Sequence, residues 1–428
     1  MAPEWVLHEG VPVADAMVLS HPEQLERLRA ASPAAVPAAV LAGDPCFDRL
    51  LAARPERERY RRALGVRPGQ RLLVLNSTWN PTSLFGDAGA ADLLPLLLGR
   101  IAELPQDDYR LAAVLHPNIG HGHGPGQVRL WLDRARRAGL TLVDPLDGWR
   151  QALLAADAVV GDFGSVSYYA AALGTPVLLG AAGEEVLGQD TPVAAFVRAA
   201  PRLDPYTALA PQLDRLLAGH RPLPGPAELT SSVPGRSAGL LRALFYRLIG
   251  LAEPAGPALL DPLPLPPYQP ARVTAPLQVL TRIAPDGAVE LRRYAAGAPE
   301  DGWAGLLAVD EETLDPGSLG LADLVLRQAA PDDPRLGPPA AWAAEALARY
   351  RHCTTAAYVT GPGTALAVTR DGRHLTLTTD PAGPQGLDPA AAAAALHAHL
   401  AAGRPPGPEL TVLTTHARHR VRLAPARM

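Results

Sequence analysis

Three short polar segments hold the residue types best suited to binding an anion, and each directly follows an apolar run. They are Asn76 to Thr82, His116 to Gly124 and Gly161 to Tyr169. The first is rich in hydroxyl and amide groups, the second contains three histidines, and the third has small residues where a helix is expected to begin. Hydroxyls, imidazoles and free helix amides all donate hydrogen bonds, so together they suit a phosphate group. For the first segment alone, an ordinary capped loop is an equal alternative.

His116 is the candidate catalytic residue. It follows the apolar run Leu111 to Leu115, and Pro117 prevents that run from continuing as a strand. An imidazole at this position could transfer a proton or donate a hydrogen bond to a phosphate. His121 and His123 raise the alternative of a metal site, but the glycines around them offer a metal no rigid scaffold. We therefore predict neither a metal nor another cofactor.

Gly164 and Ser165 are expected to begin a helix. The free amides and the positive dipole end of a helix start form a site for an anion. Asp162 lies just before this start and is expected to cap the helix or to lie beside its cap. The alternative is a helix start that is capped and has no further role.

The composition excludes several classes of enzyme. The 428 residues include no lysine, so all 39 basic residues are arginine. Without lysine the chain cannot form a Schiff base to pyridoxal phosphate, a Walker P-loop or a protein kinase site. The net charge of −4 gives no reason to expect nucleic acid as a partner. Alanine, arginine, glycine and proline are enriched together, as in a GC-rich coding sequence, so we assign no structural meaning to the alanine-rich runs.

Nothing in the sequence indicates export or membrane insertion. The first residues, Met1 to Glu4, form neither a basic nor an apolar signal region. The longest apolar stretch, Tyr168 to Ala182, is interrupted by glycine, threonine and proline, so it is not a membrane span. Two cysteines are too few for a disulfide framework. We therefore predict a cytoplasmic protein with reduced thiols and no integral membrane segment.

Residues 71–179 have the pattern of a scaffold that could hold the three polar segments. Short apolar runs alternate with helical patterns of about ten residues, which indicates βαβ units and a doubly wound parallel sheet. The expected strands are Arg71 to Leu75, Leu111 to Leu115, Leu140 to Val143, Ala158 to Val160 and Val177 to Leu179, and the expected helices are Ala91 to Leu104, Gln127 to Ala138, Trp149 to Ala156 and Ser165 to Leu173. In such a sheet, ligands bind beyond the carboxyl ends of the strands, where the polar segments begin.

A proline-rich segment divides the chain. Seven prolines fall between residues 254 and 270, a density typical of an extended spacer. Beyond the spacer the apolar pattern changes to a period of two, and two helical patterns remain, around Ala341 to Tyr350 and Pro389 to Ala402. This pattern predicts a second, smaller α+β domain. Its histidines are scattered without ligand spacing, so we assign it no site.

Four motifs resemble, in the same order, those of the CDP-glycerol glycerophosphotransferase family of teichoic-acid polymerases. Ala156 to Val166 followed by Ala172 to Val177 is similar to the family's Ala-Asp, apolar strand, Asp-Tyr-Ser-Ser-Val, helix and Pro-Val. Ser77 to Asn80 resembles the family's Pro-Thr-Trp-Arg, and His116-Pro117 resembles its His-Pro pair. Gly43 to Asp48 looks like the hinge that joins the two Rossmann halves of a GT-B transferase. The resemblance covers about residues 40–250.

The resemblance implies a nucleotide-diphosphate donor, CDP- or UDP-linked, held in the C-terminal half of a GT-B fold. It implies that His116 stabilises the charge on the leaving group during transfer. Carried over by position, the donor-binding residues are Ser77, Thr78, Asp162, Gly164, Ser165 and Val166.

The resemblance also suggests a division into domains. Residues 1–45 would be the remnant of an N-terminal GT-B half with its hinge, 46–252 the Rossmann-like donor-binding domain, 253–275 a linker, and 276–428 the smaller domain of unknown role. A complete acceptor domain would need on the order of 150 residues. We therefore expect that Met1 is not the natural start of a complete enzyme, or that self-association or a partner supplies the missing half.

Three positions depart from the family pattern. Asn80 stands where the family has arginine, Gly164 where it has serine, and Tyr169 where it has an acidic residue. Gly164 also resembles the helix start of UDP-N-acetylglucosamine 2-epimerases. The leading hypothesis is a transferase that moves a glycerophosphate or a sugar. The alternatives are a non-catalytic nucleotide-binding or interaction module, which the departures favour, and an epimerase-like protein.

Overall fold

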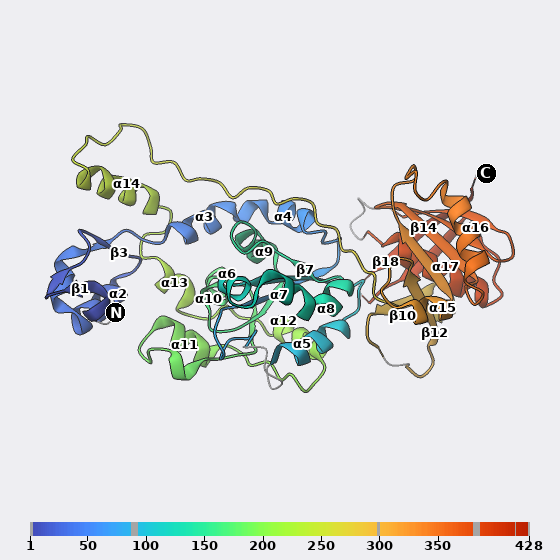
Figure 1. Ribbon diagram of the computed structural model, residues 1–428, viewed down its shortest axis with the longest axis horizontal. Coiled ribbons are helices and arrows are strands. Elements are labelled where there is room, and N and C mark those ends of the chain that lie inside the picture. Colours follow the sequence, from blue (N-terminus) through green and yellow to red (C-terminus); the bar gives the residue numbers. More distant parts are fainter. Residues whose placement is uncertain (1–2, 87–92, 298–299, 380–385, 416, 427–428) are drawn as a thin grey trace.

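The computed structural model describes residues 3–86, 93–297, 300–379, 386–415 and 417–426 (Figure 1). Three groups of elements follow one another along the long axis of the molecule. The N-terminal elements lie at one end, a parallel sheet with its helices lies in the middle, and a barrel lies at the other end. Within these ranges no helix is both long and apolar enough to cross a membrane.

The structure confirms the predicted parallel sheet. Its strands are β5 (Arg71–Ser77), β6 (Tyr109–Leu115), β7 (Thr141–Leu142), β8 (Ala158–Gly161) and β9 (Val177–Leu179). They lie in the order β7-β6-β5-β8-β9, and all neighbours are parallel. The chain therefore moves outward from β5 through β6 and β7, then returns to the other side of β5 at β8. Ligands bind at such a reversal of strand order in doubly wound sheets, here between β5 and β8.

Helices cover both faces of the sheet because successive side chains of the buried strands point to opposite sides. Leu72 and Val74 face one apolar layer, and Leu73 and Leu75 face the other. The first layer comes from α3 (Pro45–Ala53), α4 (Arg57–Ala63), α9 (Trp149–Ala155), α10 (Ser165–Ala172) and α11 (Pro192–Ala199). The second comes from α5 (Leu93–Ala102), α8 (Asp133–Arg137) and α12 (Leu209–Ala218).

Two helical segments differ from the sequence prediction. The helix expected over residues 127–138 is two helices, α7 (Pro125–Trp131) and α8, which meet at Leu132. The glycine-rich segment after β6 is not a loop but the helix α6 (Pro117–His123). His116 caps its first turn, and Ile119 is buried against Val128 and Phe85. Capping and burial outweigh the low helix propensity of glycine. Residues 91 and 92 of the helix predicted over 91–104 lie outside the described ranges.

The N-terminal elements form a small unit with its own core. They are α1 (Pro3–Val6), β1 (Leu7–His8), β2 (Val11–Pro12), β3 (Met17–Leu19), α2 (Pro22–Ala31) and β4 (Ala39–Leu41). The strands β3 and β4 form a two-stranded parallel sheet, and Leu19, Leu28 and Ala35 are buried beside it.

The segment after β4 turns tightly into α3 and is held by the start of α14 (Ser237–Leu248). Gly43 has a φ of +72°, and a β-carbon there would collide with the Ser237 hydroxyl, so only glycine fits. The Asp44 carboxylate caps α3 by accepting a bond of 2.8 Å from the Phe47 amide. Asp48 accepts the Ser237 amide at 2.9 Å. A further short helix, α13 (Pro226–Thr230), precedes α14.

The C-terminal part is a closed barrel of nine strands, where the sequence predicted only a smaller α+β domain. The strands lie in the order β10-β11-β17-β18-β16-β15-β14-β13-β12, and β12 pairs with β10 to close the circle. Their bounds are Leu277–Ile283, Val289–Tyr294, Ala304–Asp310, Leu324–Gln328, Thr355–Gly361, Thr364–Thr369, His374–Thr378, Glu409–Leu413 and Arg418–Pro425 for β10 to β18. Three helices accompany them: α15 (Pro316–Leu321), α16 (Pro339–Arg349) and α17 (Pro389–Ala401).

The alanine run at residues 390–395 has a structural role, contrary to the view that alanine enrichment is only compositional. These residues belong to α17, and Ala391 to Leu396 are fully buried. The helix contacts β10, β11 and β13 to β17, so strands surround it on most sides. The interior of a barrel of this size is just wide enough for side chains, so an enclosed helix needs the smallest ones. Alanine supplies them and is the best helix former.

A buried charge network joins the barrel to the parallel-sheet part. Arg293 on β11 is 3% exposed and forms ion pairs of 2.7 Å with both Asp107 and Asp388. Arg67 lies within 3.5 Å of the same two carboxylates. Although burial alone would raise it, Arg293 and Arg67 hold the pKa of the Asp388 carboxyl well below its usual range. The amide of Gln106 also donates to the carbonyl of Arg293 at 2.8 Å.

Candidate functional site

A pocket of about 190 Å³ lies at the carboxyl ends of β5, β6 and β8, where the strand order reverses. Six of the seven predicted site residues line it, although they come from three separate segments of the chain: Ser77, Thr78, His116, Gly164, Ser165 and Val166. The structure thus brings together parts of all three polar segments. We call this the strand-end pocket. Its remaining lining residues are Asn76, Val114, Leu115, Pro117, Pro145 and Trp149.

His116 is held in one orientation by its own helix. Its Nδ1 atom accepts a hydrogen bond of 3.1 Å from the Asn118 amide, so the proton of the neutral ring lies on Nε2. Burial lowers the pKa of the imidazole, and the nearby carboxylate of Asp162 only partly opposes this. The ring of Trp79 lies beside it, with 6.2 Å between ring centroids. His116 is therefore a neutral donor whose Nε2–H has no partner among the described residues.

The start of α10 presents unpaired amides at the same pocket. Gly164 is the residue before the first helical turn, and no side chain caps that turn. The amides of Ser165 and Val166 therefore have no intrahelical partner. The Ser165 side chain is exposed at the mouth of the pocket. These donors and the positive helix end favour an anion.

Asp162 lies beside the cap of α10, which is one of the two positions expected for it, and its side chain is fully buried. It does not line the strand-end pocket, where the resemblance placed it. One carboxylate oxygen accepts the amides of Thr78 at 2.8 Å and Leu84 at 3.1 Å and the hydroxyl of Ser77 at 3.1 Å. The other accepts the Gly164 amide at 3.0 Å. Burial raises the pKa of this carboxyl, and the four hydrogen bonds oppose the rise.

Asp162 is therefore a positioning residue rather than a ligand-binding residue. It ties the segment after β5 to the start of α10, and both segments line the pocket. Ser77 acts in the same way, since its hydroxyl also accepts the buried amide of Phe85 at 2.9 Å. Thr78 differs, because its hydroxyl has no partner among the described residues and lies beside Gly164. A β-carbon on Gly164 would lie 3.0 Å from Thr78 and from the Asp162 carboxylate, so the backbone passes close to both residues.

Sequence reasoning missed two residues of the pocket. Asn76 is 1% exposed, its Oδ1 accepts the Ser167 hydroxyl at 3.1 Å, and its Nδ2 has no partner in the described chain. This Nδ2 atom lies against Gly161, where a β-carbon would collide with it. The polar run after Leu75 was the available signal. Trp149 also lines the pocket, with the Arg150 guanidinium 4.6 Å from its ring centroid. Nothing in the sequence around Trp149, the first residue of α9, indicated that it would line a pocket.

The charge of the pocket is simple. Among its lining residues, His116 is the one titratable side chain, and none is a carboxylate or an arginine. Tyr169, which stands where the resembling family has an acid, donates a hydrogen bond of 2.7 Å to Asp44. Burial and the neighbouring carboxylate of Asp44 raise the pKa of the Tyr169 hydroxyl. Within the described ranges, no group of three or more histidine, cysteine, aspartate or glutamate side chains could hold a metal ion.

Comparison with known proteins finds structural likeness alone. No family model and no curated protein matches the sequence. A variant of the wall teichoic acid polymerase TagF is 16% identical, with a TM-score of 0.40, over 55% of this chain and 58% of that one. A protein assigned as a UDP-N-acetylglucosamine 2-epimerase from Listeria monocytogenes is 17% identical, with a TM-score of 0.33, over 57% and 63%. Anabaena HepE, in complex with UDP and glucose, is 14% identical, with a TM-score of 0.32, over 56% and 64%. The chain thus spans less than two thirds of each, and at these scores the likenesses assign it to no family.

Proposed function

We propose that the strand-end pocket binds the diphosphate of a nucleotide-linked donor and that the protein transfers a glycerophosphate or a sugar from it. The observation that carries this proposal is the convergence of three kinds of free donor on one pocket. These donors are the Nε2–H of His116, the amides at the start of α10, and the Thr78 hydroxyl. All three suit phosphate oxygens, and all three lie where the strand order reverses.

The size of the pocket supports a diphosphate rather than a whole donor. Its volume of about 190 Å³ is smaller than that of pockets that enclose a drug-sized ligand, about 300–1,000 Å³. The base and the transferred group would then extend beyond it. Trp149 on one wall and the exposed Trp79 near His116 offer flat apolar surfaces for such groups.

His116 would act on the leaving group. Transfer of a glycerophosphate or a sugar breaks a bond to a phosphate oxygen, and negative charge then develops on the departing nucleotide phosphate. The neutral imidazole donates from Nε2–H to that oxygen, while Nδ1 stays bonded to the Asn118 amide. Phosphate needs no proton to leave at neutral pH, so the role is electrostatic. The amides at the start of α10 would help to stabilise the same negative charge.

Calorimetric titration with CDP, UDP and GDP tests the binding. We expect at least one of them to bind, and we expect Ser165→Glu to abolish the binding by placing a carboxylate among the phosphate donors. The matched control is Thr82→Glu, which adds the same charge to an exposed residue that does not line the pocket. No binding of any of the three nucleotides at millimolar concentration would contradict the proposal.

The His116→Ala variant tests the chemistry separately. Removal of one donor from a developing oxyanion typically lowers the rate about 10²- to 10³-fold, and we expect a loss of that order in transfer or in donor hydrolysis. The control is His121→Ala, which removes an exposed histidine from the same helix. A rate that survives His116→Ala unchanged removes His116 from the mechanism.

A second candidate function is nucleotide binding without catalysis. It is favoured by the absence of any carboxylate or arginine among the lining residues, since His116, the one titratable side chain there, is already assigned to the leaving group and no second group remains to activate an acceptor. In that case the wild-type protein binds a nucleotide but neither transfers a group from CDP-glycerol or UDP-sugars nor hydrolyses them. Hydrolysis that depends on His116 would exclude this candidate.

The acceptor side of the reaction has to come from elsewhere. No residue before Asn76 lines the strand-end pocket, so the N-terminal unit does not form its second wall in the described chain. We propose that a second copy of the chain or a partner protein covers the pocket. Sedimentation of the purified protein with and without UDP measures this, and a monomer under both conditions would exclude a second copy.

A further inference from the structure

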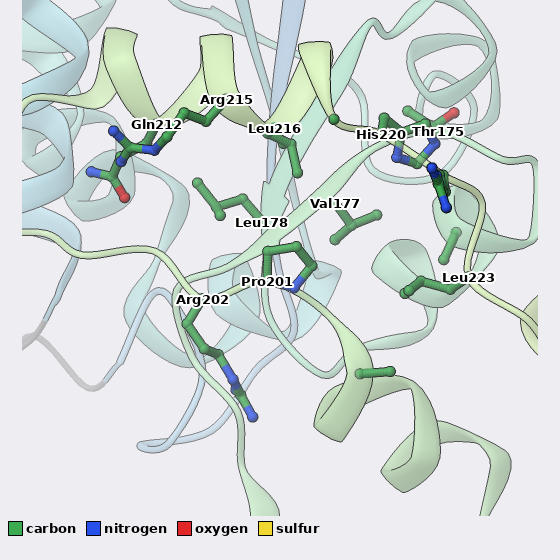
Figure 2. Close-up of a pocket in the computed structure, with 14 residues that line it drawn as sticks. Thr175, Val177, Leu178, Pro201, Arg202, Gln212, Arg215, Leu216, His220 and Leu223 are labelled. Atoms are coloured by element: carbon green, nitrogen blue, oxygen red, sulfur yellow. The ribbon is translucent and has the colours of Figure 1, made fainter.

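A second cavity lies against β9, the edge strand of the parallel sheet (Figure 2). Its volume is about 400 Å³. It is lined by β9, by α12 and by the segments that follow α11 and α12, and it shares no lining residue with the strand-end pocket. We call it the edge groove. Nothing in the proposed transfer reaction uses it.

The floor of the edge groove is apolar. Figure 2 shows Val177, Leu178, Pro201 and Leu216 in its middle. Leu223 adds a further apolar side chain, and both residues from β9 are buried in the sheet. A floor of this kind favours a hydrocarbon chain, because burial removes apolar surface from water on both sides.

The rim of the edge groove is basic, and no aspartate or glutamate lines it. Arg202 is paired with Glu184 at 2.7 Å, whereas the side chains of Arg215 and Arg221 have no hydrogen bond or ion pair with any described residue. His220 binds a backbone carbonyl oxygen through Nε2 at 2.8 Å, which leaves Nδ1 free. The groove thus carries two unpaired guanidinium groups and an imidazole beside an apolar floor.

We propose that the edge groove binds an amphipathic anion, an apolar chain that carries a phosphate group. The apolar floor would hold the chain, and the cations of the rim would attract the phosphate from either end of that floor, since Figure 2 shows Arg215 beside Gln212 at one end and His220 beside Thr175 at the other. Arginine suits phosphate because its planar fork can donate two parallel hydrogen bonds. Unpaired cations alone would fit free phosphate, and an apolar floor alone would fit a neutral hydrocarbon. The two together favour an amphiphile.

An acidic peptide is the other occupant that the charge would suit, and the sheet edge disfavours it. Peptides bind at sheet edges by adding a strand to free backbone groups. Here the chain itself covers part of that edge. The Leu179 amide donates to the Pro201 carbonyl at 2.8 Å, and the Leu203 amide donates to the Leu179 carbonyl at 2.9 Å. Strand addition beside Leu179 is therefore blocked.

Calorimetry with soluble alkyl phosphates tests the proposal, and octyl phosphate below its micelle concentration is the main probe. Each fully buried methylene is worth about fourfold in affinity. Four extra methylenes that are half buried should therefore make octyl phosphate about 16-fold tighter than butyl phosphate. Equal affinities for octyl phosphate and inorganic phosphate would overturn the proposal, as would equal affinities for octyl phosphate and octyl glucoside.

The double variant Arg215→Glu/Arg221→Glu tests the location. Both side chains are exposed and unpaired, so we expect the fold to survive and the affinity for octyl phosphate to fall more than tenfold. The matched control is Arg129→Glu, which reverses an exposed arginine on α7 outside the groove. Equal affinity in the double variant and the control would overturn the proposal. UDP binding at the strand-end pocket should be unchanged in both, so failure here is distinct from failure of the proposed function.

Vesicles identify the source of the amphiphile. We expect phosphatidylcholine vesicles without anionic lipid to leave the protein in solution. Capture by vesicles that contain phosphatidic acid, reversed by octyl phosphate, would indicate a lipid. Binding of octyl phosphate without vesicle capture would indicate a free metabolite. Vesicle capture that persists in the double variant would overturn the assignment to this groove.

Discussion

Asp162 connects the two segments that form the strand-end pocket, so its removal should damage both stability and binding. Asp162→Ala deletes the acceptor of three amides and one hydroxyl. Ser77 can still donate to the Thr78 carbonyl at 2.8 Å, and the amides of Thr78 and Gly164 lie in partly exposed residues that water can reach. The amide of Leu84, a buried residue, has no such alternative.

The magnitude follows from that inventory. One buried donor left without a partner costs about 1–3 kcal/mol, and the three other weakened bonds add about 0.5–1.5 kcal/mol each. Relief of the burial penalty that raises the pKa of Asp162 offsets part of this. We expect a net loss of about 2–4 kcal/mol in the free energy of unfolding. We also expect nucleotide binding to be lost, because the Thr78 segment is no longer tied to α10.

Urea unfolding and calorimetry with UDP measure the two effects. Asp162→Asn serves as the conservative comparison, since one oxygen can keep its three donors while the bond to the Gly164 amide is lost. It should bind UDP more tightly than Asp162→Ala. If Asp162→Ala matches the wild type in both stability and UDP affinity, the positioning role assigned to Asp162 is wrong.

Three further predictions concern the barrel and its junction. Ala393→Leu, inside the barrel, should lower the free energy of unfolding by about 1–3 kcal/mol, whereas Ala401→Leu at the exposed end of the same helix should change it little. Arg293→Ala should lower it by about 3 kcal/mol, since two carboxylates lose their main partner, and should enlarge the radius of gyration measured by X-ray scattering. Burial raises the pKa of Asp310 to about 6, so the stability it contributes is complete below the unfolded pKa of 3.8 and is lost as pH rises through 6. Asp310→Asn should therefore be more stable than the wild type by about 3 kcal/mol at pH 8 and equal to it at about pH 3, below the unfolded pKa.

The parallel sheet could be predicted from the sequence because each of its strands is a continuous apolar run that is buried on both faces of the sheet. Such runs are visible without tertiary information, as Arg71 to Leu75 and Ala158 to Val160 illustrate. Closure of the barrel could not be read in the same way. It depends on pairings between strands far apart in sequence, such as β10 with β12 and β11 with β17. Local patterns carry no information about such partners.

The candidate site shows the same limit at the level of single residues. His116 and Ser165 could be predicted as site residues from their residue type and position, because His116 follows an expected strand and Ser165 begins an expected helix. The burial of Asp162 depends on where the segment around Leu84 folds, which no local spacing reveals. The structural role of the alanine run in α17 was missed because a GC-rich coding sequence already accounted for its composition. The role becomes visible only when the strands that surround the helix are known.

The structure of the protein with CDP or UDP bound is the most direct test of the central claim. We predict that the diphosphate lies in the strand-end pocket, with its oxygens within about 3.5 Å of the Ser165 and Val166 amides and of His116 Nε2. We also predict that Nδ1 of His116 keeps its bond to the Asn118 amide. A nucleotide found elsewhere, including in the edge groove, or a strand-end pocket left empty at millimolar nucleotide, would contradict the account.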